Sequence, residues 1–352
     1  MKHYIIPVFI PHLGCLHECI FCNQRKITGR QTPVTAKQVS TIIAERLNDI
    51  NETRWVEVAF YGGSFTALPQ NIQNELLAPA SRALRQGYIH AIRLSTRPDC
   101  INRDIITNLI QQGVTIVELG VQSLDNQVLS KAGRGHDCQA VIDAVRQVKE
   151  AGLQCGLQLM PGLPGEDWES LIKTVRQVIH LHPDFVRIYP TIVIADTALA
   201  KLYQQEDYRP LSLKQAVARA AYMKLLFERQ GITVIRTGLQ ASEELNNEAN
   251  IIAGPYHAAF GEIVDSYLFY IMMAGFLEQN LVPAERELLI RHHPQDCSKV
   301  RGQRNSNINR LKQSYNLVRI ILSPDSSVKK GCLVLENQGQ TVFYNKNMIN
   351  YI

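Results

Sequence analysis

Residues 137–160 read DCQAVIDAVRQVKEAGLQCGLQLM, in which a helix, a glycine and a strand are expected in succession. The helix is predicted over 137–151, because its apolar residues recur at a spacing of three to four. Gly152 follows at the position where glycine takes the left-handed conformation that ends a helix. The apolar run Gln154–Met160 then predicts a buried strand. This stretch is therefore one helix–glycine–strand unit.

The same succession recurs along the first two-thirds of the chain. Gln86-Gly87 and Gln112-Gly113 end two earlier predicted helices, and Gln230-Gly231 ends a later one. Repetition at intervals of roughly 40 residues indicates βα units and a parallel sheet. The expected helices are 36–49, 70–86, 102–112, 137–151 and 167–180, and the expected strands are Tyr4–Ile10, Val56–Tyr61, Ala91–Ser95, Ile116–Val121, Gln154–Met160 and Phe185–Tyr189.

Six such strands predict an α/β fold, a partial (β/α)6 barrel of the TIM type, with an open doubly wound sheet as the alternative. Either fold carries its function at the carboxyl ends of the strands. The pattern changes after Tyr189, so we expect a core domain over 1–235 and a smaller α+β module over 236–352. In that second part helices are expected over 212–230 and 257–276, and strands over Leu317–Leu322, Cys332–Leu335 and Thr341–Tyr344.

The bulk composition narrows the class of protein. Charged residues make up 20% of the 352 residues, which argues against disorder. The net charge of +5 permits an anionic partner such as RNA without requiring one. No apolar run reaches 18 residues, and the first residues contain two prolines and do not form a signal peptide. We therefore expect a cytoplasmic protein with no membrane partner.

Three of the eight cysteines, Cys15, Cys19 and Cys22, fall within eight residues, directly after the first predicted strand. A cytosolic chain keeps thiols reduced, so such a group suggests a metal rather than a disulfide. Thiolates are the usual ligands of iron–sulfur clusters, and three of them leave one iron of a [4Fe–4S] cluster open. The alternative is a zinc site completed by His17 or His12, although zinc sites usually pair two Cys-x2-Cys knuckles. The other five cysteines show no second cluster spacing.

Polar or glycine-rich motifs end the next strands. Gly62-Gly63-Ser64 has two interpretations: a turn that lets a ligand approach the backbone, or an ordinary turn. Arg97 holds a carboxylate or lies in a surface turn. Glu118 and Gln122, on a strand that reads as buried, contact a ribose or amino acid or make structural hydrogen bonds.

The Cys-x3-Cys-x2-Cys spacing, with Phe21 before the last cysteine, resembles the signature of the radical S-adenosylmethionine (SAM) superfamily. The resemblance implies that the amino and carboxylate groups of SAM chelate the open iron. An electron from the reduced cluster then yields a 5′-deoxyadenosyl radical, which abstracts hydrogen from the substrate. Gly62, Gly63 and Ser64 match the motif that holds the SAM amino group, with Ser64 in place of the commoner Glu or Thr. The resemblance implies an electron donor such as flavodoxin or ferredoxin and identifies no catalytic residue.

The motifs together resemble one branch, the radical-SAM core of the Elongator catalytic subunit, from residue 4 to about 235. The resemblance to this branch depends mostly on two motifs, Ser-Thr-Arg-Pro at 95–98 and Arg-Ile-Tyr-Pro-Thr at 187–191. That subunit modifies the wobble uridine of tRNA, and its acetyltransferase glycine loop has no counterpart after residue 235. We therefore expect a radical reaction in tRNA modification. One alternative is a small-molecule enzyme like coproporphyrinogen oxidase, although that enzyme has a further cysteine where this chain has Asn23-Gln24. The other alternative is a non-catalytic zinc or iron–sulfur protein.

The segment Lys299–Lys312 has five basic residues and no acidic one. Gly302-Gln303-Arg304-Asn305, followed by a helix and the strand Leu317–Leu322, resembles the loop, helix and strand of a KH RNA-binding unit. Asn305 replaces the second glycine of that loop and tolerates a left-handed conformation. A KH-like unit over 299–344 is thus expected to bind RNA; the alternative is a solvated basic surface.

Overall fold

The computed structural model describes residues 2–10, 15, 19–23, 34–50, 54–240, 247, 249–280, 287–337 and 340–349. The chain divides into two compact units, the first made of Met1–Ser212 and Ile232–Tyr256, the second of Leu213–Gly231 and His257–Ile352. The units interleave along the chain, in contrast to the single boundary near residue 235 that the sequence suggested. The reason is helix α9 (Leu213–Arg229), which packs against α11 (Phe260–Asn280) of the second unit.

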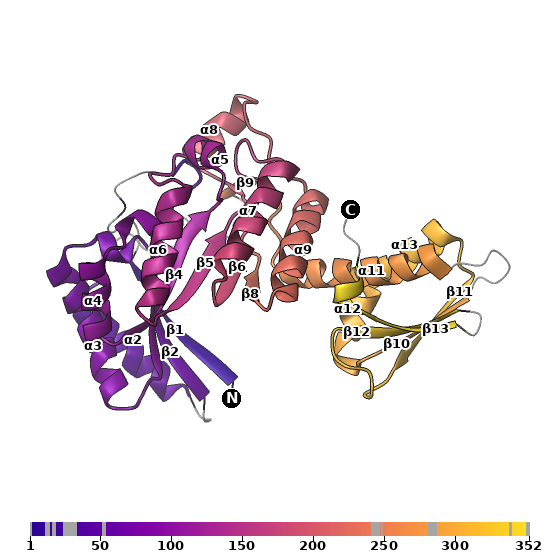
Figure 1. The fold of residues 1–352 in the computed structure, drawn as a ribbon, viewed down its shortest axis with the longest axis horizontal. Helices are drawn as coiled ribbons and strands as arrows, with labels where there is room; N and C mark the ends of the chain where they lie inside the picture. Colours follow the sequence, from indigo (N-terminus) through magenta and orange to yellow (C-terminus); the bar gives the residue numbers. More distant parts are fainter. Residues whose placement is uncertain are drawn as a thin grey trace. The chain divides into compact units, whose positions relative to one another are not determined.

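The first unit is built on a seven-stranded parallel sheet with the strand order β1-β2-β3-β4-β5-β6-β8 (Figure 1). This confirms the predicted α/β class and the partial barrel. The strands are β1 (Lys2–Ile10), β2 (Arg54–Gly62), β3 (Ala91–Thr96), β4 (Val114–Gln122), β5 (Gln154–Leu159), β6 (Phe185–Ile188) and β8 (Thr233–Thr237). The helices of this unit are α2 (Ala36–Asn48), α3 (Gln70–Arg85), α4 (Arg103–Gln111), α5 (Asn126–Lys131), α6 (Cys138–Glu150), α7 (Trp168–Leu181) and α8 (Ala198–Gln204).

All six expected strands of the core are present, and β8 is a seventh that was not expected. It lies at the edge of the sheet beside β6, and its residues are partly buried or exposed. An edge strand lacks the continuous apolar run that marks a central strand, so its sequence signal is weak. Two further short strands, β7 (Val193–Ile194) and β9 (Ile251–Ala253), pair antiparallel.

The helix–glycine–strand units form as predicted. At the end of α6, Gly152 has φ of +73°, and the N–H of Leu153 donates to the carbonyl of Val148 at 3.2 Å. This bond closes the helix and turns the chain toward β5. A capping box begins α2, because the Gln38 N–H donates to Thr35 Oγ1 at 3.3 Å and the Thr35 N–H donates to Gln38 Oε1 at 2.9 Å.

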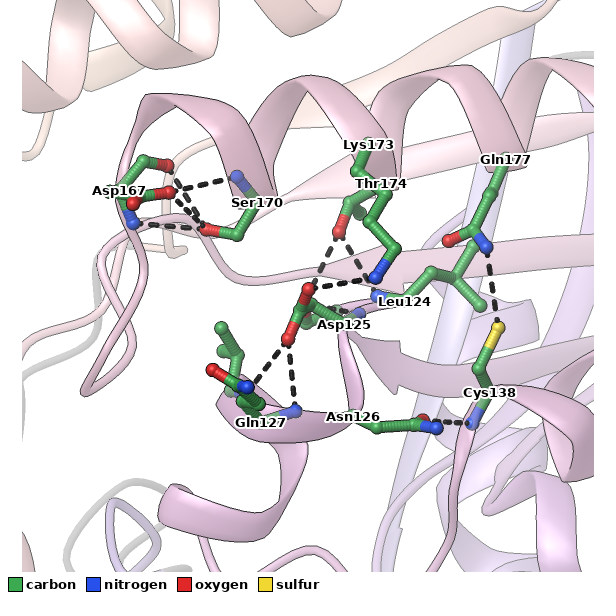
Figure 2. Close-up of polar contacts among 12 residues, drawn as sticks. Leu124, Asp125, Asn126, Gln127, Cys138, Asp167, Ser170, Lys173, Thr174 and Gln177 are labelled. Carbon is green, nitrogen blue, oxygen red and sulfur yellow. Dashed lines mark hydrogen bonds and ion pairs between the residues drawn. The ribbon is translucent and has the colours of Figure 1, made fainter.

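Side-chain caps also fix α5 and α7, which flank the carboxyl ends of β4 and β5 (Figure 2). Asp125 accepts from the N–H groups of Gln127 at 2.9 Å and Val128 at 3.3 Å, and it pairs with Lys173 of α7 at 3.1 Å. Asp167 accepts from the Ser170 N–H at 2.8 Å to begin α7. These contacts hold the short helix α5, and the loop after it, in place.

The two faces of the sheet differ in chemistry. Side chains alternate between the faces of a strand. Phe60, Leu94, Leu119 and other fully buried residues form the apolar side of the sheet. The opposite face of the sheet carries charged side chains that contact one another, among them Glu57, Arg93, Glu118 and Arg187. The polar face is thus the one available for chemistry.

The second unit has helices packed on a four-stranded sheet of order β11-β10-β12-β13. The strands are β10 (Glu287–His292), β11 (Arg319–Pro324), β12 (Cys332–Asn337) and β13 (Gln340–Asn345), and the helices besides α9 and α11 are α12 (Cys297–Arg301) and α13 (Ser306–Tyr315). The predicted α+β module is confirmed. In the described part of the chain, α11 alone has the length and apolar composition of a membrane span, yet most of it is buried, as expected of a core helix.

Candidate functional site

The cysteine-bearing segment follows β1 and is anchored where the parallel strands end. Phe21 is buried among Val128, Ala132 and Leu163. The backbone is also held, because the Ile20 N–H donates to the Ala132 carbonyl at 3.2 Å. Cys15, Cys19 and Cys22 are all described, whereas His12 and His17, the alternative zinc ligands, lie outside the described residues. The segment thus lies at the edge of the sheet where a barrel carries its active site.

Two arginines lie beside the thiols. Arg134 Nη1 donates to Cys19 Sγ at 3.0 Å, and Arg134 Nη2 donates to the Gly120 carbonyl at 2.5 Å. Burial raises the pKa of the Cys15 thiol, while a hydrogen bond from the Ser64 backbone N–H and the positive charges of Arg97 and Arg134 act in the opposite direction. Cations and backbone N–H groups stabilise thiolate over thiol. Arg97, Arg134 and the Ser64 N–H thus offset part of the effect of burial, although the pKa of Cys15 stays above its usual value.

The donor set fits an iron–sulfur cluster in its chemistry, since three thiols lie on one short segment with cations beside them. Within the described residues, no three or more His, Cys, Asp or Glu side chains are grouped closely enough to hold a metal ion. Joint coordination by Cys15, Cys19 and Cys22 would thus draw their side chains closer together.

The glycine turn after β2 lies directly beside this segment. The Gly63 N–H donates to the Ile10 carbonyl at 2.9 Å, which ties the turn to the end of β1. Gly62 has φ of +107°, and a Cβ there would lie 3.4 Å from the Ile10 backbone. Ser64 is 1% exposed, and its hydroxyl lies 3.0 Å from Thr96 Oγ1. The predicted residues Gly62, Gly63 and Ser64 are thus placed against Cys15, with which the Ser64 N–H is hydrogen bonded.

Arg97 joins the same neighbourhood through its backbone, whose N–H donates to Ser64 Oγ at 3.3 Å. Its side chain forms a fork with Asp99, with Nε at 2.9 Å from Oδ1 and Nη2 at 2.6 Å from Oδ2. Burial would raise the pKa of Asp99, but hydrogen bonds with His136 and Arg97 hold that pKa well below its usual range. The remaining nitrogen, Arg97 Nη1, is buried without a partner among the described residues.

Glu118 lies in a different cluster, in which its carboxylate is held by two arginines. Arg93 Nη1 donates to Glu118 Oε1 at 2.6 Å, and Arg187 Nη2 donates to the same oxygen at 3.0 Å. Arg187 Nη2 also donates to the hydroxyl of Tyr61 at 2.9 Å, and burial, aided by Glu118, raises the pKa of Tyr61 to about 12. The sequence left open whether Glu118 contacts a ligand or makes structural hydrogen bonds, and the two arginines supply the structural hydrogen bonds.

Gln122, the other predicted residue of β4, ends that strand with φ of +69°. Its Oε1 accepts from Gln158 Nε2 at 3.2 Å, and its backbone carbonyl accepts from the Met160 N–H at 2.9 Å. Gln122 thus connects the ends of β4 and β5 through both its side chain and its backbone.

Sequence reasoning missed three residues of this site, Arg93, Arg134 and His136. Arg134 and His136 lie in the polar loop after α5, and such loops usually read as solvated surface. Arg93 carried a usable signal, because a charge inside an otherwise apolar strand requires a buried partner. Arg187 was noted as part of a motif, without its role as the second partner of Glu118.

Comparison with known proteins identifies the class. Residues 9–178 match the family model of the radical SAM superfamily, and residues 183–269 match the Radical_SAM C-terminal domain. An uncharacterized protein of Methanocaldococcus jannaschii is 30% identical over 233 residues, which cover 62% of this chain and 70% of that protein.

A tRNA uridine(34) acetyltransferase of Methanocaldococcus infernus is 33% identical over 266 residues. The match covers 64% of this chain, which spans only half of that enzyme's length. Among solved structures, the archaeal Methanocaldococcus infernus Elp3 with an N-terminal deletion has a TM-score of 0.60 at 19% identity, covering 95% of this chain and 73% of that chain. That likeness shows a shared fold, and with the sequence matches it establishes that this chain belongs to the radical SAM superfamily of enzymes.

Proposed function

We propose that this chain is a cytoplasmic radical SAM enzyme of tRNA modification, whose [4Fe–4S] cluster is held by Cys15, Cys19 and Cys22. The observation that carries the proposal is the neighbourhood of the cysteine segment. Arg134 lies 3.0 Å from Cys19 Sγ, and the Ser64 N–H is directed at the Cys15 thiol. When bound, the cluster and SAM supply hydrogen-atom abstraction by a 5′-deoxyadenosyl radical. The protein supplies binding, orientation and electrostatics.

The residues around the thiols suit the polar end of SAM. Gly62 and Gly63 leave the backbone open to a close approach, and Ser64 is fixed beside them by Thr96. Arg97 has one buried N–H group without a described partner, which a carboxylate would satisfy. The proposal therefore assigns the amino group of SAM to the glycine turn and its carboxylate to Arg97.

Glu118 and Gln122 are proposed to line the site further along β4. Glu118 accepts hydrogen bonds from Arg93 and Arg187, which fix the position of its side chain. Gln122 retains an amide that can reorient toward a ribose or amino acid, since a side-chain amide has two donors and an acceptor. Their role is to orient the bound molecule.

Transfer RNA is the proposed substrate because the related enzymes act on uridine 34 of tRNA. The chain spans about half of such a relative, so the reaction after hydrogen abstraction is not carried over from it. An electron donor such as flavodoxin or ferredoxin is the proposed partner, since the cluster has to be reduced before each reaction.

Iron analysis of anaerobically purified protein tests the cluster. We expect a brown protein with about four irons per chain. Cys19→Ala should lose most of that iron, while Cys138→Ala, a thiol on α6 that contacts Gln177, should retain it. Stoichiometric zinc in a colourless preparation would contradict the proposal and favour a zinc-binding protein.

A further inference from the structure

The second unit carries exposed positive charge around the junction of α12 and α13. Of the five basic residues in Lys299–Lys312, two are engaged: Lys299 Nζ lies 2.8 Å from Asp265 Oδ2, and the guanidinium of Arg310 lies 4.0 Å from the centre of the Tyr270 ring. The other three, Arg301, Arg304 and Lys312, are exposed, and none has an acidic partner in the described part of this unit. Their charge is available to an anion.

The junction itself is firmly built. Gly302 has φ of +72°, and a Cβ there would collide with the Ser306 side chain. Buried Asn307 donates from Nδ2 to the Ser266 carbonyl at 2.9 Å and to the Lys299 carbonyl at 3.1 Å, which ties both helices to α11. The residues between Gly302 and Asn307 are exposed, and two of them are held in the left-handed conformation. The loop therefore projects from a fixed base.

The topology around this loop is that of a helix pair between parallel strands. β10 and β11 are parallel neighbours, and α12 and α13 connect them along the chain (Figure 1). A short glycine-containing loop between two such helices is where a KH domain clamps the nucleic-acid backbone. The structure thus adds the first helix and β10 to the loop, helix and strand that the sequence suggested.

The helix that follows the loop contacts a strand with apolar groups exposed to solvent. β11 contacts α13 and is an edge strand of its sheet. Val318, just before it, is 68% exposed, and Ile321 within it is 36% exposed. Surfaces that bind single-stranded nucleic acid combine cations for the phosphates with side chains that pack against the bases, most often aromatic ones, and here the exposed apolar side chains of Val318 and Ile321 would take that place. Both parts are present here within one small unit.

We infer that Arg301, Arg304, Lys312 and the exposed edge of β11 form a binding surface for single-stranded RNA. A peptide that added a strand to β11 would make no use of Arg301 and Arg304, so the basic loop favours RNA as the occupant. The inference deepens the proposed function, because it names the surface of this chain that would hold the RNA substrate. It does not depend on the cluster.

The test is fluorescence anisotropy of the full chain with a labelled 12-nucleotide single-stranded RNA at several salt concentrations. Replacing both arginines (R301A/R304A) should flatten the log–log salt slope by about 1.4, at roughly 0.7 per phosphate contact, and weaken binding about 25-fold at 0.1 M salt. The matched control R82A/R85A removes two exposed arginines of α3 and should leave both values unchanged.

A second variant separates base contacts from charge. V318S/I321S removes exposed apolar groups and should weaken binding roughly tenfold with an unchanged salt slope, because no charge is lost. Heparin and a 12-base-pair RNA duplex serve as competitors, and single-stranded RNA should compete better than either.

The inference is overturned if R301A/R304A binds RNA as the wild type does, if V318S/I321S has no effect, or if heparin competes as well as single-stranded RNA. SAM cleavage by R301A/R304A should match the wild type, since the variant lies outside the cysteine site. A chain that binds RNA through this surface but lacks SAM cleavage would contradict the proposed function alone.

Discussion

Arg97 shows how a single residue reaches the glycine turn through its backbone while its side chain holds a buried donor. It is 5% exposed, and Asp99 accepts from two of its three nitrogens. The third nitrogen, Nη1, is buried without a described partner, and an unsatisfied buried donor costs free energy until a ligand pairs with it. The structure therefore holds one donor ready for an anionic group, on a residue whose backbone N–H binds Ser64.

Arg97→Lys should preserve the positive charge but lose the planar fork. We expect the dissociation constant of SAM to rise roughly 10- to 100-fold, the range for losing one charge-assisted hydrogen bond. Anaerobic equilibrium dialysis with labelled SAM measures this change, and the iron content should remain that of the wild type. Arg103→Lys, at the exposed start of α4, is the control. Unchanged SAM affinity in Arg97→Lys would remove Arg97 from the proposed site.

The two glycines of the turn should respond differently to substitution. Gly62 has φ of +107°, whereas Gly63 is not among the glycines with positive φ. Gly62→Ala should therefore destabilise the fold by about 1 kcal/mol or more, because alanine strains that conformation. Gly63→Val should leave the iron content unchanged and weaken SAM binding by blocking the backbone. Equal SAM affinity for Gly63→Val and the wild type would show that the ligand does not approach this backbone.

Among the elements of the second unit, α9, α11 and α12 are joined by one partly buried carboxylate. Asp265 of α11 lies 2.6 Å from Lys224 Nζ of α9 and 2.8 Å from Lys299 Nζ of α12. Burial raises the pKa of Asp265, but the two lysines outweigh it and hold that pKa below its usual value. This bridge is also why α9 groups with the second unit although it follows β6 along the chain.

The pKa of Asp265 is lower in the folded chain than in the unfolded chain, where it is about 3.9. The ionised carboxylate therefore stabilises the fold at pH values above about 3.9. The stabilisation is lost as the pH falls through 4 and below. Asp265→Asn should lower stability by roughly 1–3 kcal/mol at pH 7, and the difference should shrink toward pH 3. Chemical denaturation at the two pH values measures it. Asp143→Asn, in an exposed pair with Arg146, should change stability by less than about 0.5 kcal/mol. A deficit for Asp265→Asn that is constant with pH would contradict this account.

The elements that the sequence predicted are those with a strong local signal. Gly152 and its counterparts end helices through a backbone conformation that depends on one residue, and central strands such as β4 are mostly apolar and buried. Two strands of the larger sheets were not expected: the edge strand β8, whose residues are partly buried or exposed, and β10, which lies between β11 and β12 and whose buried residues alternate with more exposed ones. Arg134 and the pairing of Arg93 with Glu118 depend on contacts between residues far apart in sequence, so no local pattern contains them.

At the scale of the whole molecule, the chain combines a polar-lined parallel sheet with a separate unit that carries exposed basic residues. The first unit gathers the glycine turn, Arg97 and the cysteine segment at the carboxyl ends of its strands, where parallel α/β folds place their chemistry. The family match covers residues 9–178 and 183–269, and so includes the whole of this neighbourhood. The central claim is that this neighbourhood binds a cluster and uses it to cleave SAM.

The most direct test is the formation of 5′-deoxyadenosine by anaerobic protein with a strong reductant and SAM. We expect the wild type and Cys138→Ala to yield 5′-deoxyadenosine and methionine even without substrate, and Cys19→Ala to yield neither. Chromatography of the quenched reaction quantifies both products. A wild-type protein that carries its cluster and binds SAM but forms no 5′-deoxyadenosine would contradict the account.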